Sequence, residues 1–416
     1  RTYEEALHLY ETYKNNLLGI ITDVAYGKGG KIDKQAGVKL CRHIREEDNE
    51  LPILLQSSRE EHRKDAEEYN ASFIHKNSKA LLKELREYIR INYGFGDFVF
   101  RDPEILSPIM RAHDLWDLQH RLPEVPDDSF IYHVKNNDFS KWLKARAVFT
   151  LANYLRPKQL TDFDNVHDAK YFIINAIKEF RIQEGRGTIA EFQRERFDEI
   201  SFFSRIGSGS LGGKGRGLAF IDLQLKHRRL TFKHSGVVIT IPRTVVLTTQ
   251  IFEDFMEANN LWETAISEAD DETIRKAFLE ARLPEKIDED IAAILQVVKN
   301  PIAVRSSSLL EDSHYQPFAG IYETFMLPNN HDNFRHRFED LSNAIKLVYA
   351  STYFRRSKDY MLATNNMIEE EKMGVIIQEV TGSNYGNLCY PNISGVARSL
   401  NFYPIEHEHS DDGIVN

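Results

Sequence analysis

The sequence predicts a multi-domain protein of the mixed α/β class, and three observations lead to this prediction. The chain has 416 residues, which at roughly 150 residues per domain is enough for about three domains with their own cores. In the first 92 residues, short apolar stretches alternate with amphipathic helical patterns, as in a doubly wound parallel sheet. Beyond residue 200, a glycine-dense loop precedes further apolar stretches that end in polar residues. We therefore expect an α/β domain at residues 1–92, a mainly helical connector at 93–200 and a second α/β domain at 201–416.

The composition is that of an ordinary globular protein. Hydrophobic residues make up 42% and charged residues 28% of the chain, and 53 Lys and Arg against 63 Asp and Glu give a net charge of -10. Without a basic stripe to offset this charge, we expect no nucleic-acid partner. No apolar run is long enough for a membrane span, and two distant cysteines, Cys41 and Cys389, fit a reducing compartment. We therefore expect a cytoplasmic protein, and the start at Arg1 suggests a portion of a longer chain.

Polar residues end each predicted strand of the first domain. The apolar stretches are Leu17–Thr22, Leu51–Gln56 and Ala71–Ile74. Since chemistry in such sheets gathers beyond the carboxyl ends of the strands, these polar residues should converge. They are Asp23, then Ser57 and Ser58, then Lys76. A carboxylate, a hydroxyl and an ammonium at one edge could accept a phosphoryl group and hold its oxygens, although each residue alone could equally serve as a turn or cap.

The motifs IITDV, PILLQSS and SFIHK in this order resemble the later part of a response-regulator receiver domain, which has a flavodoxin-like fold. The resemblance implies that Asp23 accepts phosphate, that Ser57 or Ser58 reorients on phosphorylation and that Lys76 contacts the phosphate, with a histidine kinase as partner. Two features depart from the family. Its first strand, with a magnesium-binding acidic pair, would precede Arg1, and a glycine- and lysine-rich insertion occupies residues 25–35. Both a phosphorylated receiver and a pseudo-receiver retained for docking remain open.

The connector, residues 93–200, shows no site motif. The stretch GFGDFVFRDPE indicates a hinge and an edge strand, and helical patterns follow it. We expect the aromatic residues of this region to pack in a core or between domains.

The glycine-dense loop has six glycines between Gly207 and Gly217 and contains Lys214. Such a loop exposes backbone N–H groups that can surround phosphate oxygens, and the helix that follows favours an anion at its N-terminus. It is not a P-loop, because Gly215 stands where a P-loop has Ser or Thr. A flexible hinge is the alternative interpretation.

A second cluster begins with a predicted strand at Ile302–Val304, which delivers Arg305 and three serines. Arginine can hold phosphate oxygens in bidentate fashion, and hydroxyls can satisfy the rest. Further polar residues follow it: Glu311, Asp312, Gly320 and Thr324. A structural salt bridge between Arg305 and one of the two acids is the alternative. A third apolar stretch, Met373–Ile377, leads into Gln378, Glu379 and Val380, whose backbone could meet the edge of a planar ring.

Taken together, these pieces resemble the ATP-binding domain of the phosphoenolpyruvate synthase and pyruvate phosphate dikinase family, which has an ATP-grasp fold. The resemblance extends over residues 204–416 through LGGKGRGLA, IPRTVVLTTQIFEDFM, NPIAVRSSSLLEDS, FAGIYETF, VIIQEV and SGVARSLNFYP. It implies ATP and Mg²⁺ as cofactors, with Lys214 and Arg305 on the ATP phosphates. It also implies a phosphate-covering loop and an adenine hinge. The residues that it places at the ATP site are Gly212, Gly213, Lys214, Arg305, Ser306, Glu311, Asp312, Gly320, Thr324, Gln378, Glu379 and Val380.

The resemblance implies the N-terminal part of an ATP-dependent phosphotransferase of the dikinase type, and the receiver-like domain could regulate it. The family's magnesium-binding acid, its phosphorylated histidine and its acceptor domain would lie beyond Asn416, so the metal ligands are undetermined here. Pyruvate or another acceptor would bind there. Two alternatives remain open: an ATP-binding signalling regulator without phosphoryl transfer, and a related kinase for a different acceptor.

Overall fold

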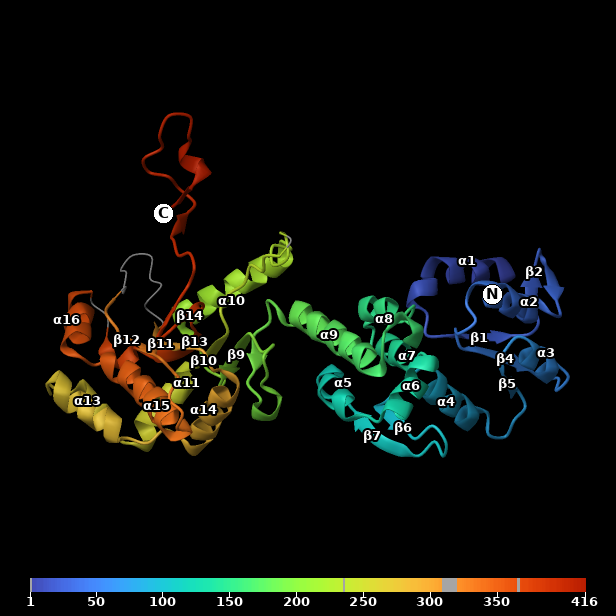
Figure 1. Ribbon diagram of the computed structural model, residues 1–416, viewed down its shortest axis with the longest axis horizontal. Helices are drawn as coiled ribbons and strands as arrows, with labels where there is room; N and C mark the ends of the chain where they lie inside the picture. The colour runs from blue at the N-terminus through green and yellow to red at the C-terminus, as the bar shows by residue number, and fades with distance from the viewer. Residues whose placement is uncertain (1, 235, 309–319, 365–366) are drawn as a thin grey trace. The chain divides into compact units, whose positions relative to one another are not determined.

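The computed structural model describes residues 2–234, 236–308, 320–364 and 367–416. The chain divides into two compact units, residues 1–182 and residues 183–416, and each is described by itself (Figure 1). Within the described residues, no helix combines the length and apolar character that crossing a bilayer requires.

The first unit begins with a three-stranded parallel sheet in the order β1-β4-β5. Its strands are β1 (Ile20–Asp23), β4 (Ile53–Ser57) and β5 (Ser72–His75). The accompanying helices are α1 (Tyr3–Tyr13), α2 (Ala36–Glu47), α3 (His62–Glu68) and α4 (Leu81–Asn92). A short 3-10 turn, η1 (Lys14–Asn16), follows α1.

Both faces of this small sheet are covered, as the uninterrupted apolar strands predict. Leu55 packs with residues of α1, α2 and α3. The neighbouring Leu54 packs on the opposite face with Tyr88 of α4 and with Tyr93. Because alternate side chains of β4 enter two different clusters, residues 53–55 of the strand are all apolar.

The glycine- and lysine-rich insertion forms a hairpin of β2 (Tyr26–Lys28) and β3 (Lys31–Asp33). Gly29 and Gly30 make its turn, both with positive φ. The backbone N–H of Gly29 donates to the Glu4 carboxylate at 3.0 Å, and Lys28 Nζ lies 3.9 Å from the centre of the Tyr3 ring. The insertion is therefore held against α1.

The rest of the first unit consists of a hairpin and a group of helices around one apolar cluster. The hairpin is β6 (Phe98–Arg101) and β7 (Pro108–Ala112), so the expected edge strand is present and has a partner. Phe98 stacks on Phe139 with ring centres 4.7 Å apart, which supports the predicted packing role of these aromatic residues. The helices are α5 (Leu115–Arg121), η2 (Leu122–Glu124), α6 (Asp127–Lys135), α7 (Asp138–Lys144), α8 (Phe149–Leu155), η3 (Leu160–Asp162) and α9 (Val166–Gly185).

The second unit is built on a six-stranded mixed sheet in the order β12-β11-β13-β10-β9-β8. Pairing is parallel from β8 through β9 to β10 and antiparallel from β10 through β13 and β11 to β12. The strands are β8 (Ala190–Glu191), β9 (Phe203–Ile206), β10 (Thr244–Leu247), β11 (Ile302–Ser308), β12 (Thr324–Leu327) and β13 (Met373–Glu379).

Helices cover the two faces of this sheet unequally. Figure 1 shows α13, α14 and α15 on one side of the sheet and α10 on the other. The first side contains the large apolar core, with Val304 and Val375 among its buried members. The side of α10 has a much smaller cluster around Val246 and Ile376. The helices are η4 (Arg194–Arg196), α10 (Gly212–His227), α11 (Thr249–Ala258), α12 (Trp262–Ile266), α13 (Asp271–Glu280), α14 (Glu285–Val297), α15 (Phe334–Ser351), α16 (Arg355–Ala363) and η5 (Ile368–Glu370).

The C-terminal residues form two small hairpins that extend away from the sheet (Figure 1). Their elements are β14 (Ser383–Tyr385), β15 (Leu388–Tyr390), β16 (Ala397–Arg398), η6 (Ser410–Asp412) and β17 (Ile414–Val415). Most side chains here are exposed, including the apolar ones of Ile393 and Tyr403.

Candidate functional site

The glycine-dense loop lies between β9 and α10 and packs tightly against its neighbours. Gly207 has φ +90°, and a Cβ atom there would lie 2.4 Å from Thr248 Oγ1. Gly212 has φ +71°, and a Cβ atom there would lie 1.6 Å from the backbone oxygen of Ser307. Glycine is required at both positions by conformation and by close approach. These contacts favour a fixed loop over the alternative of a flexible hinge.

Several backbone N–H groups of this loop already donate to protein side chains. The acceptors all follow β10: Ser208 N–H donates to Gln250 Oε1 at 2.8 Å, Gly209 N–H to Thr248 Oγ1 at 3.3 Å and Ser210 N–H to Thr249 Oγ1 at 3.0 Å. The first part of the loop is thus held rigid by these bonds. In the first turn of α10, whose N–H groups lack a partner within the helix, Gly212 N–H also donates to Ser210 Oγ at 3.2 Å and Gly215 N–H to Ser307 Oγ at 2.9 Å.

Lys214, in that first turn, reaches strand β11. Its Nζ donates to Ser306 Oγ at 3.1 Å and to the Ser306 backbone oxygen at 3.3 Å. Ser307 Oγ donates to the Leu211 backbone oxygen at 2.6 Å and accepts from Gly215 N–H at 2.9 Å. Both serines therefore fix the N-terminus of α10 against the end of β11.

Arg305 lies on the same face of the sheet as α10. It pairs across the ladder with Ile376, and Ile376 packs with Leu211 in the small cluster under α10. Directly opposed residues of antiparallel strands share a face. Arg305 Nη1 donates to Gln378 Oε1 at 3.3 Å, and Gln378 Nε2 donates in turn to Thr244 Oγ1 at 3.0 Å.

Beyond α10, described residues of β12 on this face are exposed. Thr324 pairs with Arg305 across β12 and is exposed, and Met326, two residues on, is 62% exposed. Gly320 has φ +76°, and a Cβ atom there would meet nothing within 4 Å. The strand register thus places Arg305, Gln378 and Thr324 on one face of the sheet. Glu311 and Asp312 lie outside the described residues.

Residues 378–380, expected as an adenine hinge, already use their donors within the protein. Glu379 N–H donates to the Arg243 backbone oxygen at 2.9 Å, and Val380 N–H donates to that of Pro301 at 2.8 Å. The Glu379 carboxylate lies 3.2 Å from Arg243 Nη1 and accepts from Asn300 Nδ2 at 2.6 Å. This carboxylate is thus engaged in the protein, and the described residues on this face do not form a set of carboxylates that fits Mg²⁺.

Residues 208–415, half of the chain, match the family described as the pyruvate phosphate dikinase AMP/ATP-binding domain. The chain belongs to this family.

Two curated relatives also match this chain. A protein named uncharacterized phosphotransferase YvkC from Bacillus subtilis is 26% identical over 173 residues, which cover 41% of this chain and 18% of that protein. A phosphoenolpyruvate synthase from Deinococcus radiodurans is 34% identical over 129 residues, covering 30% of this chain and 15% of that protein. The matched parts span less than a fifth of each relative. At family level, residues 208–415 are therefore an AMP/ATP-binding domain.

The sequence reasoning did not single out Gln250, Thr248 or Thr249 as site residues. These side chains bind the glycine loop of the family's domain, as described above. Their signal was the polar TTQ immediately after the apolar strand Thr244–Leu247. Three polar residues at a strand's carboxyl end, close to a glycine loop, could have been recognised as its support.

The second predicted site lies in the first unit, at the carboxyl edge of the parallel sheet. Lys76 Nζ lies 2.6 Å from Asp23 Oδ2. Lys76 N–H donates to the Ser57 backbone oxygen at 2.9 Å. Ser57 is buried and its Oγ accepts from Arg59 N–H at 3.1 Å, whereas Ser58 is exposed. Asp23 and Lys76 are therefore in direct contact, whereas Ser57 meets Lys76 through its backbone and its hydroxyl bonds to Arg59 N–H instead.

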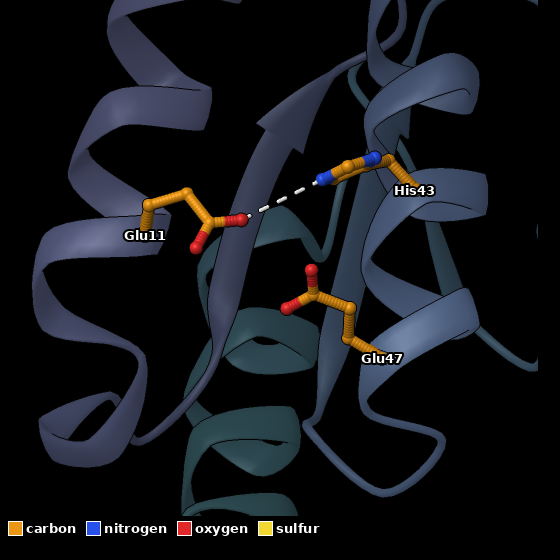
Figure 2. Close-up of side chains that lie close together, drawn as sticks. All are labelled: Glu11, His43 and Glu47. Atoms are coloured by element: carbon orange, nitrogen blue, oxygen red, sulfur yellow. Dashed lines mark ion pairs between the residues drawn. The ribbon is translucent and has the colours of Figure 1, made fainter.

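A third cluster has the residue types of a metal site, but a lysine ammonium lies close to both of its carboxylates. Figure 2 shows Glu11 of α1 facing His43 and Glu47 of α2. Glu11 Oε1 lies 3.7 Å from His43 Nε2. However, Lys14 Nζ lies 2.9 Å from Glu11 Oε2 and 3.1 Å from Glu47 Oε2. An ammonium thus already balances both carboxylates, and we interpret the cluster as an ion-pair network that joins α1 to α2.

Proposed function

We propose that ATP binds on the open face of the second unit, with its phosphates between the N-terminus of α10 and strand β11. The observation that carries this proposal is the contact of Lys214 with Ser306, which holds an ammonium at the end of the strand that presents Arg305. The two cations supply the charge that a polyphosphate needs, and the N-terminus of α10 adds the partial positive charge of its helix dipole.

The wider activity that we propose is transfer of a phosphoryl group from ATP toward pyruvate or another acceptor. Phosphoryl transfer requires mainly positioning and charge stabilisation, and Lys214 and Arg305 suit those roles. The names of the two relatives support a phosphotransferase. The alternative, an ATP-binding regulator, shares the same site and differs in having no transfer.

Calorimetric titration with ATP tests the binding step. Lys214→Ala and Arg305→Ala should each weaken binding by about 1.5–3 kcal/mol, the range for hydrogen bonds to charged groups. Lys276→Ala, on the exposed surface of α13 where the side chain is 74% exposed, is the matched control and should bind ATP like the wild type. Equal affinities for all four proteins would contradict the proposal.

A second proposed function concerns the carboxyl edge of the first sheet. We propose that Asp23 accepts a phosphoryl group from a histidine-kinase phosphohistidine, with one carboxylate oxygen attacking phosphorus and the histidine nitrogen leaving. The contact of Lys76 with Asp23 favours this, because the ammonium already lies where the added negative charge would develop. Beryllofluoride, a mimic of the phosphoryl group, should bind the wild type and fail to bind Asp23→Asn. Absence of binding to the wild type would favour a docking domain instead.

A further inference from the structure

A cleft in the first unit carries chemistry that neither proposed site uses. It has a volume of about 340 Å³ and lies among the end of α4, the β6–β7 hairpin and helices α6 and α7. This size falls within the range of pockets for small ligands, roughly 300–1,000 Å³. All of its lining residues belong to the same compact unit.

The cleft has an excess of positive charge. Four cations line it, Arg90, Arg101, Arg111 and Lys141, against two carboxylates, Asp97 and Asp138. This local excess contrasts with the net charge of -10 of the whole chain.

Both carboxylates of the cleft already have partners. Asp138 Oδ2 accepts from His133 Nδ1 at 2.7 Å, and its other oxygen lies 3.9 Å from Lys141 Nζ. Asp97 lies 2.9 Å from His113 Nδ1 and 3.9 Å from Arg111 Nη1.

The two remaining cations of the cleft, Arg90 and Arg101, could bind an anionic group of a ligand. Across the described part of the chain, neither Arg90 nor Arg101 has a carboxylate partner, and Arg101 Nη1 donates to the Leu106 backbone oxygen at 2.8 Å. Guanidinium groups without a carboxylate partner favour phosphate or carboxylate oxygens, which they can bind in bidentate fashion.

The walls of the cleft are held in place before any ligand binds. Trp142 Nε1 donates to the Gly96 backbone oxygen at 3.0 Å, and Arg146 Nη2 donates to the same oxygen at 2.5 Å. The Arg146 guanidinium also lies 3.6 Å from the centre of the Trp142 ring. On the other side, His133 Nε2 accepts from Arg101 N–H at 3.0 Å. A preorganised wall reduces the ordering cost of binding.

We propose that this cleft binds a small anionic molecule, whose phosphate or carboxylate group is held by Arg90 and Arg101 and whose apolar or planar part packs against the aromatic wall near Trp142 and Tyr132. None of the cleft's lining residues belongs to the compact unit that carries the proposed ATP site. It also involves none of Asp23, Ser57 and Lys76.

The test uses the full 416-residue chain carrying Lys214→Ala, so that phosphate binding on the second unit is weakened. Phenyl phosphate, benzoate and uncharged benzyl alcohol are titrated by ligand-observed nuclear magnetic resonance. One of the two anions should bind saturably and benzyl alcohol should not. Tighter binding of phenyl phosphate would identify a phosphate ligand, and tighter binding of benzoate a carboxylate ligand.

Substitutions locate the binding. Arg90→Gln, an exposed position on α4, and the pair Arg90→Gln with Arg101→Gln should weaken it, the pair at least tenfold. Arg86→Gln, one turn earlier on the same helix and outside the cleft, should leave it unchanged. If the double variant fails to fold, the Arg90→Gln variant alone tests the proposal. Absence of saturable binding, equal binding of benzyl alcohol, or affinity insensitive to Arg90→Gln would overturn the proposal.

Discussion

The backbone oxygen of Ser307 lies where a Cβ atom of Gly212 would be, at 1.6 Å from its ideal position. The glycine loop and strand β11 are therefore in direct backbone contact. This contact brings the N-terminus of α10 next to Ser306 and Ser307 at the C-terminal end of β11.

Gly212→Ala should destabilise the second unit. The substitution adds both a steric clash and a strained left-handed residue, so we expect a loss of more than about 1 kcal/mol in unfolding free energy. Gly217→Ala is the control, because Gly217 lies within α10 and a Cβ atom there meets nothing within 4 Å. It should stabilise the protein by about 0.5–1 kcal/mol. Chemical denaturation of both variants checks this, and an unchanged midpoint for Gly212→Ala would show that the loop moves freely.

Lys76→Ala should abolish binding at the carboxyl edge of the first sheet while changing the stability of the protein only slightly. The side chains of Lys76 and Asp23 are 40% and 44% exposed, so solvent screens the ion pair and its loss should cost less than about 1 kcal/mol. Beryllofluoride binding should nevertheless be lost, since the ammonium would contact the bound group. Lys83→Ala on the exposed surface of α4 should retain binding. Equal binding by both variants would remove Lys76 from the proposed site.

Lys144→Met should stabilise the first unit at neutral pH. Lys144 is only 7% exposed, and burial, together with the nearby Arg156 charge, lowers its pKa from the ordinary 10.5. Keeping it protonated in the folded state therefore costs stability, and Met removes this cost, on the order of 1 kcal/mol. Lys135→Met, at an exposed position of α6, is the control in thermal unfolding.

The sign of the pH dependence for Lys144 follows from the lowered pKa. The cost is fully present below the folded-state pKa and disappears as the pH rises toward 10.5, where the unfolded chain also loses its proton. The advantage of Lys144→Met should therefore shrink as the pH rises through this window. An advantage that stays constant or grows with pH would contradict the assignment.

The two cysteines should differ in reactivity toward a thiol-disulfide reagent. Burial raises the pKa of the Cys41 thiol to about 12, and its side chain is fully buried. Cys389 lies in the C-terminal hairpin and is partly exposed. Since the thiolate is the reactive form, one thiol per chain should react rapidly and the second only with unfolding. Cys389→Ser should abolish the rapid phase, and a rapid phase that persists would contradict the burial of Cys41.

Patterns of apolar residues predicted much of the fold. The three parallel strands of the first unit and the strands that carry Arg305 and Gln378 follow from short apolar stretches with polar ends. The hairpin formed by the insertion after Asp23 was not predicted, because its glycines and lysines carry no periodic apolar signal. Its position depends on tertiary contacts with Glu4 and Tyr3.

The sequence predicted individual residues of the candidate site, but not the side chains and backbone groups that hold those residues in place. Lys214 and Arg305 have a chemistry that can be read from residue type and context. The use of Glu379 N–H by Arg243, or of Ser208 N–H by Gln250, depends on pairings between segments far apart in the chain. Likewise, the cationic cleft near Arg90 collects residues from α4, a hairpin and two helices, and no local motif marks it.

Hydrogen exchange measured by mass spectrometry, with and without ATP, tests most directly whether ATP binds between α10 and β11. We predict that ATP slows amide exchange in peptides covering residues 207–216 and 302–308, because the bound phosphates would engage the first turn of α10 and hold it against β11. Peptides from residues 1–182 serve as the internal reference and should show much smaller changes. Protection confined to the first unit, or no protection of residues 207–216 at saturating ATP, would contradict the proposed site.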